Sequence, residues 1–209
     1  IGVAGARGLK PLIGASADLQ TALLALKAEK IQPGMDLSQL DAGLAEYKKM
    51  AARVQAQTSF DAAGVIDIST VLKRAGMSDK QILGGGAESV AQLATAYKDV
   101  SPDLAAEIIS HTQAALGSTN INDLANILAQ VSSSTTTNVV DLYRGLIPGG
   151  SAAKRFGLTD REHAAFVATM QGRGIESTKA GEASKAFYAK LAEAWSDKKK
   201  RATLQAQGI

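Results

Sequence analysis

Apolar side chains recur at helical intervals along most of the chain. Leu19, Leu23 and Leu26 are three or four residues apart, so they lie on one face of a helix. The same spacing recurs in three later stripes: Ile121, Leu124, Leu128 and Val131; Val139, Leu142, Tyr143 and Leu146; and Phe187, Leu191 and Trp195. No stretch shows the sustained alternation of apolar and polar residues that is typical of strands. The pattern therefore predicts an all-α fold.

Glycine, proline and cap residues divide this pattern into short helices. Ser101 suits an N-cap, and Pro102 suits the first position of a helix. The predicted breaks are Pro33-Gly34, Gly84-Gly85-Gly86, Gly117, Pro148-Gly149-Gly150 and Gly172-Arg173-Gly174. The predicted helices start at Asp36 or Ser38, Phe60, Asp79, Pro102, Asn120, Thr136 or Thr137, Asp160 and Lys179, after a first helix that ends at Pro33-Gly34. We expect a compact array of about eight to ten short helices.

One nine-residue segment occurs twice. Residues 73–81 (KRAGMSDKQ) closely match residues 154–162 (KRFGLTDRE). Each copy has two basic residues, a glycine, an apolar residue, a Ser or Thr, and a Gln or Glu three positions later. This order is typical of a helix that ends at a left-handed glycine and is followed by a capping box. The predicted structural turn residues are Gly76, Ser78, Gln81, Gly157, Thr159 and Glu162. We interpret the repeat as a duplicated helix-turn-helix corner. The alternative is that two unrelated segments converged on the same favourable sequence for a corner.

Composition removes several classes of function. The 209 residues include no Cys, which excludes a disulfide scaffold, thiol catalysis and Cys-ligated zinc. The longest uncharged stretch, residues 124–140, contains a run of Ser and Thr that is too polar for a membrane span. The net charge of +3 is a small excess, and much of it lies in the run from Lys198 to Arg201. The chain begins without Met or a signal-peptide pattern, so we expect it to be cut from a longer polypeptide.

Candidate catalytic chemistry is sparse. His111 and His163 are the only histidines, and their spacing matches no metal-binding motif, so both are interpreted as structural. The glycine-rich segments 84–86 and 172–174 lack the pattern of a phosphate-binding loop. We therefore predict no catalytic residue, no cofactor and no metal site.

Charged and aromatic residues near the end of the chain also favour structural roles. Glu176 and Glu182 are interpreted as helix-terminus charges rather than a glycosidase pair. The basic run 198–201 has no interleaved aromatics, so nucleic-acid binding is not expected for this segment. The stripe of Phe187, Tyr188, Leu191 and Trp195 is interpreted as a packing surface rather than a ligand site.

From about Gln57 onward the chain resembles the core domain of bacteriophage tail tape measure proteins of long-tailed phages and prophages. The resemblance rests on the order and spacing of several weak motifs. They are residues 60–63 (FDAA), 73–78 (KRAGMS), 89–96 (SVAQLATA), 123–129 (DLANILA) with 139–142 (VVDL), 157–162 (GLTDRE) and 174–181 (GIESTKAG). The last has the family's closing pattern Gly-Ile-x-Ser-x-x-Ala-Gly, which adds Gly174, Ala180 and Gly181 to the predicted structural turn residues. Residues 143–150 depart from the family pattern, and its long coiled coil and apolar membrane-like segment have no counterpart here.

The resemblance implies a structural protein of a phage tail and not an enzyme. Such proteins occupy the lumen of the tail tube, help to set tail length and leave ahead of the genome during ejection. The implied partners are the tail tube protein, tail assembly chaperones and the tail-tip or baseplate hub, with a homo-oligomer expected. The implied locations are the virion tail and, during assembly, the host cytoplasm. Membrane contact is not supported within this segment.

Two domains are predicted: an N-terminal helical segment over residues 1–57, and a tape-measure core-like domain over 58–209. The alternatives left open are an unrelated helical adaptor module that binds proteins and a cell-wall hydrolase domain.

Overall fold

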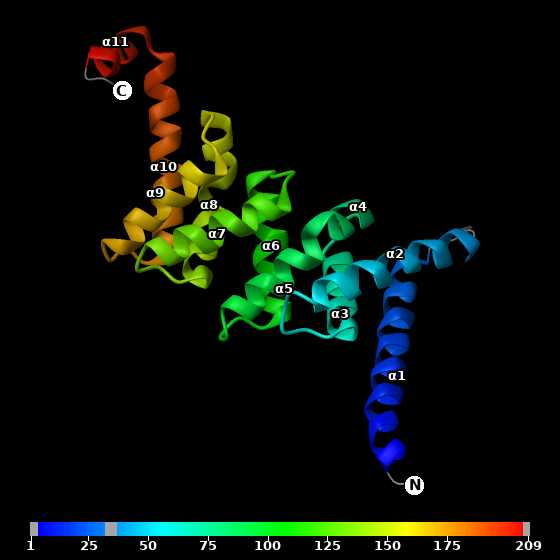
Figure 1. Ribbon diagram of the computed structural model, residues 1–209. Helices are drawn as coiled ribbons and strands as arrows, with labels where there is room; N and C mark the ends of the chain where they lie inside the picture. Colours follow the sequence, from blue (N-terminus) through cyan, green and yellow to red (C-terminus); the bar gives the residue numbers. More distant parts are fainter. Residues whose placement is uncertain (1–3, 32–36, 207–209) are drawn as a thin grey trace. The chain divides into compact units, whose positions relative to one another are not determined.

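Helices account for nearly all of the structure, a computed structural model that describes residues 4–31 and 37–206. Within these ranges no strand is present, which confirms the predicted all-α class (Figure 1). The predicted break at Pro33-Gly34 and the predicted cap at Asp36 lie outside the described residues.

The chain divides into two compact units, residues 1–110 and 111–209. The helices of the first unit are α1 (Ala4–Lys30), α2 (Leu37–Gln55), α3 (Ala62–Arg74), α4 (Asp79–Gln81) and α5 (Ala87–Ala96). Helix α6 (Pro102–Leu116) contains the division point. The helices of the second unit are α7 (Ile121–Ser134), α8 (Val139–Phe156), α9 (Asp160–Gly172), α10 (Ser177–Ser196) and α11 (Lys198–Ala206). The boundary predicted between residues 57 and 58 remains a prediction, and α1 and α2 pack on α3 within the first unit.

Helix α3 is the centre of the first unit, where it contacts α1, α2 and α5. Its apolar residues Val65, Ile66 and Leu72 are completely buried, as are Leu26 of α1 and Val54 of α2. Removing such side chains from water is the main driving force for folding. The β-branched residues that weaken α3 as an isolated helix are therefore compensated by packing.

The glycine run between α4 and α5 forms a π-helical segment, η1 (Ile82–Gly86). Gly85 has φ 125°, a backbone conformation that favours glycine, and the helix is kinked there. The helical backbone is therefore interrupted at Gly85, which confirms the predicted break at Gly84-Gly85-Gly86.

Helix α8 is the centre of the second unit and packs mainly against α10, with α7 and α9 beside it. The prediction that this helix ends at Pro148-Gly149-Gly150 is wrong, because α8 continues to Phe156. Its N-cap is Asn138, which accepts a hydrogen bond from the Asp141 backbone N–H at 2.8 Å, rather than Thr136 or Thr137. Pro148 has no N–H, so the helix lacks one hydrogen bond there, and close packing against α9 and α10 compensates for that loss.

The last predicted helix, from about Lys179 to Lys200, is two helices in the structure. Helix α10 starts at Ser177 and ends at Ser196, and Asp197 has an extended backbone between α10 and α11.

Candidate functional site

Both copies of the repeated segment form the same kind of corner. Gly76 follows α3 with φ 87°, and Gly157 follows α8 with φ 93°. The N–H of Met77 donates to the Leu72 carbonyl at 3.1 Å, as that of Leu158 does to the Ala153 carbonyl at 3.0 Å. This six-to-one hydrogen bond together with a left-handed glycine defines a Schellman motif, which satisfies carbonyls at the helix end.

A capping box follows each of these glycines. The Ser78 hydroxyl accepts from the Gln81 backbone N–H at 3.3 Å, and the Gln81 amide oxygen accepts from the Ser78 N–H at 2.9 Å. In the second corner Thr159 and Glu162 exchange the same bonds, at 3.2 and 2.8 Å. Hydrogen bonds from the Thr159 backbone and hydroxyl lower the pKa of Glu162. Each corner therefore ends one helix and starts the next with matched local hydrogen bonds.

The two corners also share an ion pair that spans the turn. Lys73 Nζ lies 2.9 Å from Asp79 Oδ1, and Lys154 Nζ lies 2.6 Å from Asp160 Oδ1. These are equivalent positions in the two copies of the repeat. The sequence comparison matched the four residues without indicating that they pair.

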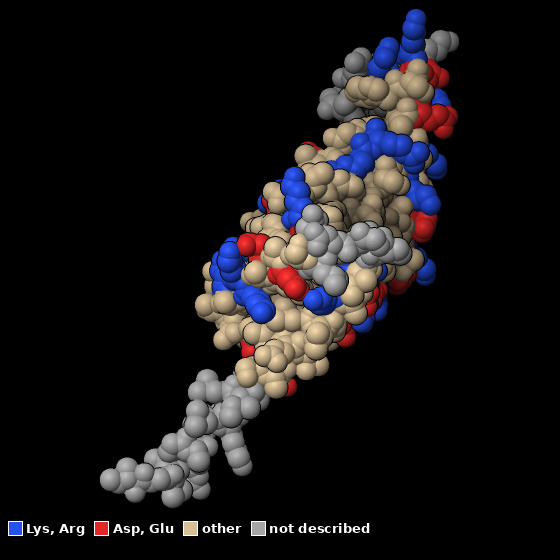
Figure 2. All heavy atoms as spheres, turned by 90° about the vertical axis from the view of Figure 1, so that its right-hand side faces the viewer, with Lys and Arg blue, Asp and Glu red and all other residues tan. Residues whose placement is uncertain are grey.

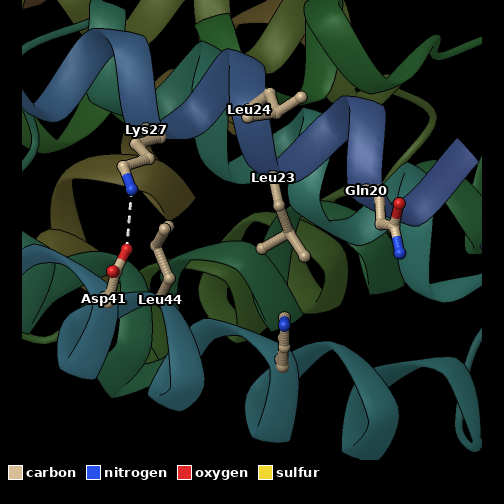
Figure 3. Close-up of a pocket in the computed structure, with 7 residues that line it drawn as sticks. Gln20, Leu23, Leu24, Lys27, Asp41 and Leu44 are labelled. Atoms are coloured by element: carbon tan, nitrogen blue, oxygen red, sulfur yellow. Dashed lines mark hydrogen bonds and ion pairs between the residues drawn. The ribbon is translucent and has the colours of Figure 1, made fainter. Parts of the chain in front are cut away.

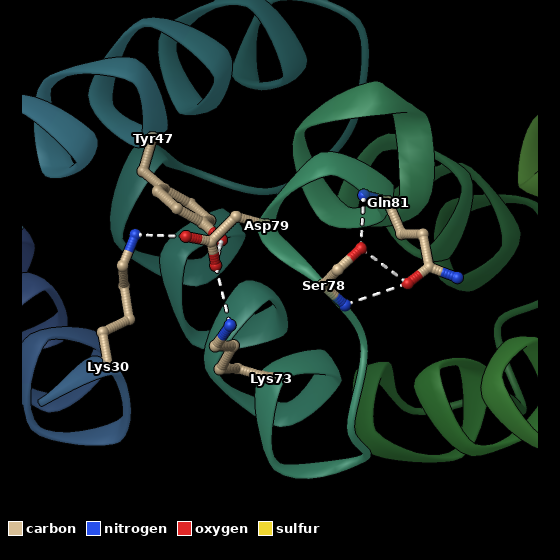
Figure 4. A network of polar contacts seen from close by, with 6 residues as sticks. All are labelled: Lys30, Tyr47, Lys73, Ser78, Asp79 and Gln81. Atoms are coloured by element: carbon tan, nitrogen blue, oxygen red, sulfur yellow. Dashed lines mark hydrogen bonds and ion pairs between the residues drawn. The ribbon is translucent and has the colours of Figure 1, made fainter. Parts of the chain in front are cut away.

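In the first corner Asp79 is the centre of a larger network, drawn in Figure 4. Lys30 of α1 donates to Asp79 Oδ2 at 2.7 Å, and the Tyr47 hydroxyl of α2 donates to Oδ1 at 3.0 Å. The Lys30 ammonium also lies 4.8 Å from the centre of the Tyr47 ring, in cation–π geometry. Asp79 thus connects α1, α2 and α3 to the start of α4.

The electrostatics follow from these contacts. Partial burial alone would raise the pKa of Asp79, but hydrogen bonds from Lys30, Lys73 and Tyr47 outweigh it and lower that pKa to about 2. Burial of Tyr47, together with the adjacent Asp79 charge, raises the pKa of the Tyr47 phenol. The network is therefore ionised at Asp79 and neutral at Tyr47 at physiological pH.

His163 connects helices of the second unit, and it follows the capping box by one residue. Its ring is fully buried, with Nδ1 3.1 Å from the Tyr188 hydroxyl and Nε2 3.0 Å from the Leu146 carbonyl oxygen. A carbonyl only accepts, so Nε2 carries the proton and Nδ1 accepts from Tyr188. Burial lowers the pKa of His163, against the smaller opposing effects of the Leu146 hydrogen bond and the Asp160 charge. The imidazole is thus a neutral connector between α8, α9 and α10.

Beside His163, helices α8 and α10 approach each other through glycines. A Cβ on Gly181 would lie 2.5 Å from the Gly145 carbonyl oxygen and 2.9 Å from the Pro148 ring. A Cβ on Gly149 would lie 2.1 Å from the Ser184 hydroxyl oxygen. Real Cβ atoms essentially never come this close to other heavy atoms, so these contacts require glycine. We call this contact, made by Gly145, Pro148, Gly149, Gly181 and Ser184, the glycine crossing.

The glycine crossing explains the closing pattern of residues 174–181. Gly174 ends the turn after α9 with φ 87°. Glu176 then caps α10, because its carboxylate accepts from the backbone N–H groups of Thr178 and Lys179. Ala180 and Gly181 are buried against α8. The pattern therefore turns the chain and places the smallest residues of α10 at the crossing.

Several residues that hold this unit together were missed by sequence reasoning. Gly149 was interpreted as a helix end, and Ser184 was not singled out at all. Tyr188 was expected on a packing stripe, where it is buried, but Phe187 and Trp195 of the same stripe are 47% and 40% exposed. The four-residue spacing of Gly145 and Gly149 was the one available signal, since it places both glycines on one helix face.

Two grooves with mainly apolar linings lie on the units. In the first unit a groove of about 380 Å³ lies between α1 and α2. Leu23 and Leu44 both point into the space between these helices, and the Lys27–Asp41 ion pair of 2.7 Å lies next to Leu44 (Figure 3). In the second unit a groove of about 570 Å³ is lined by Arg155, Phe156, Leu191, Ala192 and Trp195. Neither lining contains a carboxylate pair, a histidine or another group with evident catalytic chemistry. A third groove of about 390 Å³ in the second unit is lined by residues that include Asp141 and Glu176. Asp141 accepts a hydrogen bond from the Asn138 side chain at 2.7 Å, and Glu176 caps α10.

Charge and metal-binding groups add no further site in the described part of the chain. No group of three or more His, Cys, Asp or Glu side chains is placed to hold a metal ion there. None of the helices described is both long and apolar enough to cross a membrane. On the face drawn in Figure 2, Lys and Arg side chains are interspersed with Asp and Glu.

Comparison with known proteins gives one match. A family model described as phage-related minor tail protein matches residues 47–209. No curated protein and no solved structure matches the chain. The match includes both corners, the glycine crossing and Tyr47, while Lys30 lies outside it.

Proposed function

The chain belongs to the phage-related minor tail protein family, and from this premise we propose that it is a segment of a tail tape measure protein. The family assigns it to the structural proteins of a phage tail. The finer assignment is supported by the ordered motifs between residues 60 and 181, which resemble the tape-measure core. In this proposal the segment lies in the lumen of the tail tube, takes part in tail assembly and length control, and leaves during genome ejection.

We further propose that this segment is a folded module of the tape rather than part of its measuring length. A single helix of all 209 residues would span roughly 310 Å at 1.5 Å per residue. The chain instead stops its helices at Gly76, Gly157 and Gly174 and folds α10 back on α8. The observation that carries the proposal is this glycine crossing, because its buried contacts exist only when the helices are folded together.

A folded module acts through its surfaces, so the proposed partners are the tail tube protein, tail assembly chaperones and the hub at the tail tip or baseplate. A homo-oligomer is part of the same proposal. The role is structural rather than enzymatic. Of the two carboxylates that a hydrolase interpretation could have used, Glu176 caps α10 and Glu182 lies 3.8 Å from Lys185.

Deletion of residues 1–209 in frame from the full-length protein tests the proposal. We expect loss of tails or of infectivity, scored by electron microscopy and plaque assay. Functional tails shortened by about 310 Å would show instead that the segment is part of the ruler. Normal tails of unchanged length would contradict both roles.

A point substitution tests whether the module must be folded, rather than merely present in the protein. Gly181→Val places a branched side chain into the crossing, whereas Gly172→Ala meets only Thr136 Oγ1 at 3.6 Å, an ordinary contact. We expect phage with the first substitution to lose tails or infectivity at the growth temperature, and phage with the second to assemble normally. Equal assembly of both would contradict a requirement for the folded module.

A further inference from the structure

The part of α1 that is docked on the first unit lies at its C-terminal end. Among the side chains described on this helix, Ala22, Leu23, Leu26 and Lys30 are buried, whereas residues 15–18 are exposed. Helix α1 contacts mainly α3, and the groove of about 380 Å³ lies between it and α2. The docked part, residues 22–30, is therefore held by few apolar side chains, and one buried lysine lies among them.

Lys30 enters a socket for its ammonium group. Its Nζ lies 2.7 Å from Asp79 Oδ2 and 4.8 Å from the centre of the Tyr47 ring (Figure 4). Gly43, one helical turn before Tyr47, leaves the space for it, because a Cβ on Gly43 would lie 3.2 Å from Nζ. We call this arrangement of Gly43, Tyr47 and Asp79 the lysine socket.

The lysine socket keeps a cationic partner when Lys30 leaves it. Asp79 Oδ1 accepts from Lys73 of α3 at 2.9 Å and from the Tyr47 hydroxyl of α2 at 3.0 Å, so neither donor belongs to α1. Removing one partner of a buried ion pair is costly mainly because the other charge is left uncompensated. Here Asp79 stays paired and Lys30 regains water, so the socket can open without leaving an unpaired charge in the core.

The other ion pairs of α1 are also suited to opening. Lys27 lies 2.7 Å from Asp41 of α2, and Glu29 lies 2.8 Å from Arg74 at the end of α3. The Asp41 and Arg74 side chains are 65% and 60% exposed, and exposed pairs of this kind contribute little to stability. Helix α3 also contacts α2 and α5, and these contacts do not involve α1.

We propose that α1 is a releasable strap. Residues 22–30 come off the first unit together as the lysine socket opens, while α2, α3 and α5 stay folded. Release uncovers the Tyr47 ring and the face of α3 on which α1 lies. The family match starts at Tyr47, so the strap lies outside the part of the chain that the family model covers. The proposal rests on the first unit alone and does not depend on the tape-measure assignment.

Hydrogen exchange of the full chain, resolved by residue with NMR, tests the release. Opening of a strap requires less free energy than unfolding of the core, so its backbone amides are less protected. We expect residues 22–26 of α1 to be at least about a hundredfold less protected than residues 66–72 of α3. Equal protection of the two segments would overturn the proposal, because α1 would then open only when the core unfolds.

Lys30→Glu tests whether the lysine socket holds the strap. It sets a second carboxylate against Asp79, so the protection of residues 22–26 should fall at least about tenfold, while residues 66–72 still exchange more slowly than they do. Lys98→Glu makes the same change in net charge at an exposed position after α5 and should leave both segments within about twofold of the wild type. The proposal would be overturned if Lys30→Glu left α1 as protected as in the wild type, or if it removed the protection of α3 as well.

Discussion

Replacing Gly181 by alanine tests whether the glycine crossing holds the second unit together. The added Cβ would lie 2.5 Å from the Gly145 carbonyl oxygen and 2.9 Å from Pro148 Cδ and Cγ. These neighbours are a backbone atom of α8 and a proline ring, so they cannot swing aside as the end of a long side chain can. Helices α8 and α10 must separate to accept the methyl group.

The expected cost follows from two opposing effects. Overpacking of a closely packed core destabilises by roughly 1–3 kcal/mol, and the rigid neighbours here favour the upper part of that range. Alanine at a helical position gains up to about 1 kcal/mol over glycine. We therefore expect the free energy of unfolding to fall by about 1–2 kcal/mol.

Gly172→Ala is the matched control in the same unit. It is also a helical glycine, but an added Cβ meets only Thr136 Oγ1 at 3.6 Å. The control should therefore be neutral or stabilising by up to about 1 kcal/mol. Guanidinium unfolding followed by circular dichroism and by Trp195 fluorescence measures both variants, and Trp195 lies in the second unit. If Gly181→Ala is as stable as the wild type or more stable, the reasoning about the crossing is refuted.

Three further predictions concern the corners and their networks. Gly157→Val should destabilise by on the order of 1 kcal/mol or more, because valine is strained at φ 93°, and an unchanged melting temperature would contradict this. Burial lowers the pKa of His163 in the folded state, so below about pH 6.5 the unfolded chain binds more protons and the free energy of unfolding should fall. In denaturant titrations, His163→Gln should show a weaker loss of stability between about pH 6.5 and 5. The pKa of Asp79 is about 2 in the folded state and ordinarily 3.8, so its contribution to the free energy of unfolding is present above pH 3.8 and is lost between pH 3.8 and 2. Acid-unfolding curves of Asp79→Asn should lack this loss.

The all-α class and the corners could be predicted from sequence because they are local. Helical spacing, a left-handed glycine and a capping box each depend on residues within about one or two turns of helix. Gly76 and Gly157 therefore have positive φ, and both capping boxes are present. The ion pair between Lys73 and Asp79 is also local, but the sequence pattern for a corner does not require it.

The end of α8 could not be predicted, because the deciding contacts are distant in sequence. Pro148-Gly149-Gly150 is locally a strong stop signal. In the structure Gly149 is required instead by Ser184, which lies 35 positions later, and Gly150 by the backbone of Ala115. Glycine as a breaker and glycine as a contact residue give the same sequence signal. Only the partner helix distinguishes them.

The candidate networks show the same limit. His163 and Asp79 are each set in place by a local corner, but their roles come from residues 25 to 49 positions away, Tyr188 for the first and Lys30 for the second. No motif in either segment indicates which distant side chain completes the site.

The repeated corner is therefore the same local structure in two different surroundings. In the first unit the Lys–Asp pair is extended by Lys30 and Tyr47 into a charged network. In the second unit the same pair stands beside a neutral histidine and the glycine crossing. The family match begins at Tyr47, so it includes the acceptor Asp79 and its donors Tyr47 and Lys73 but excludes Lys30. Lys73 pairs with Asp79 from inside the matched region, and α1 adds the second, buried ammonium of the network from the residues before it.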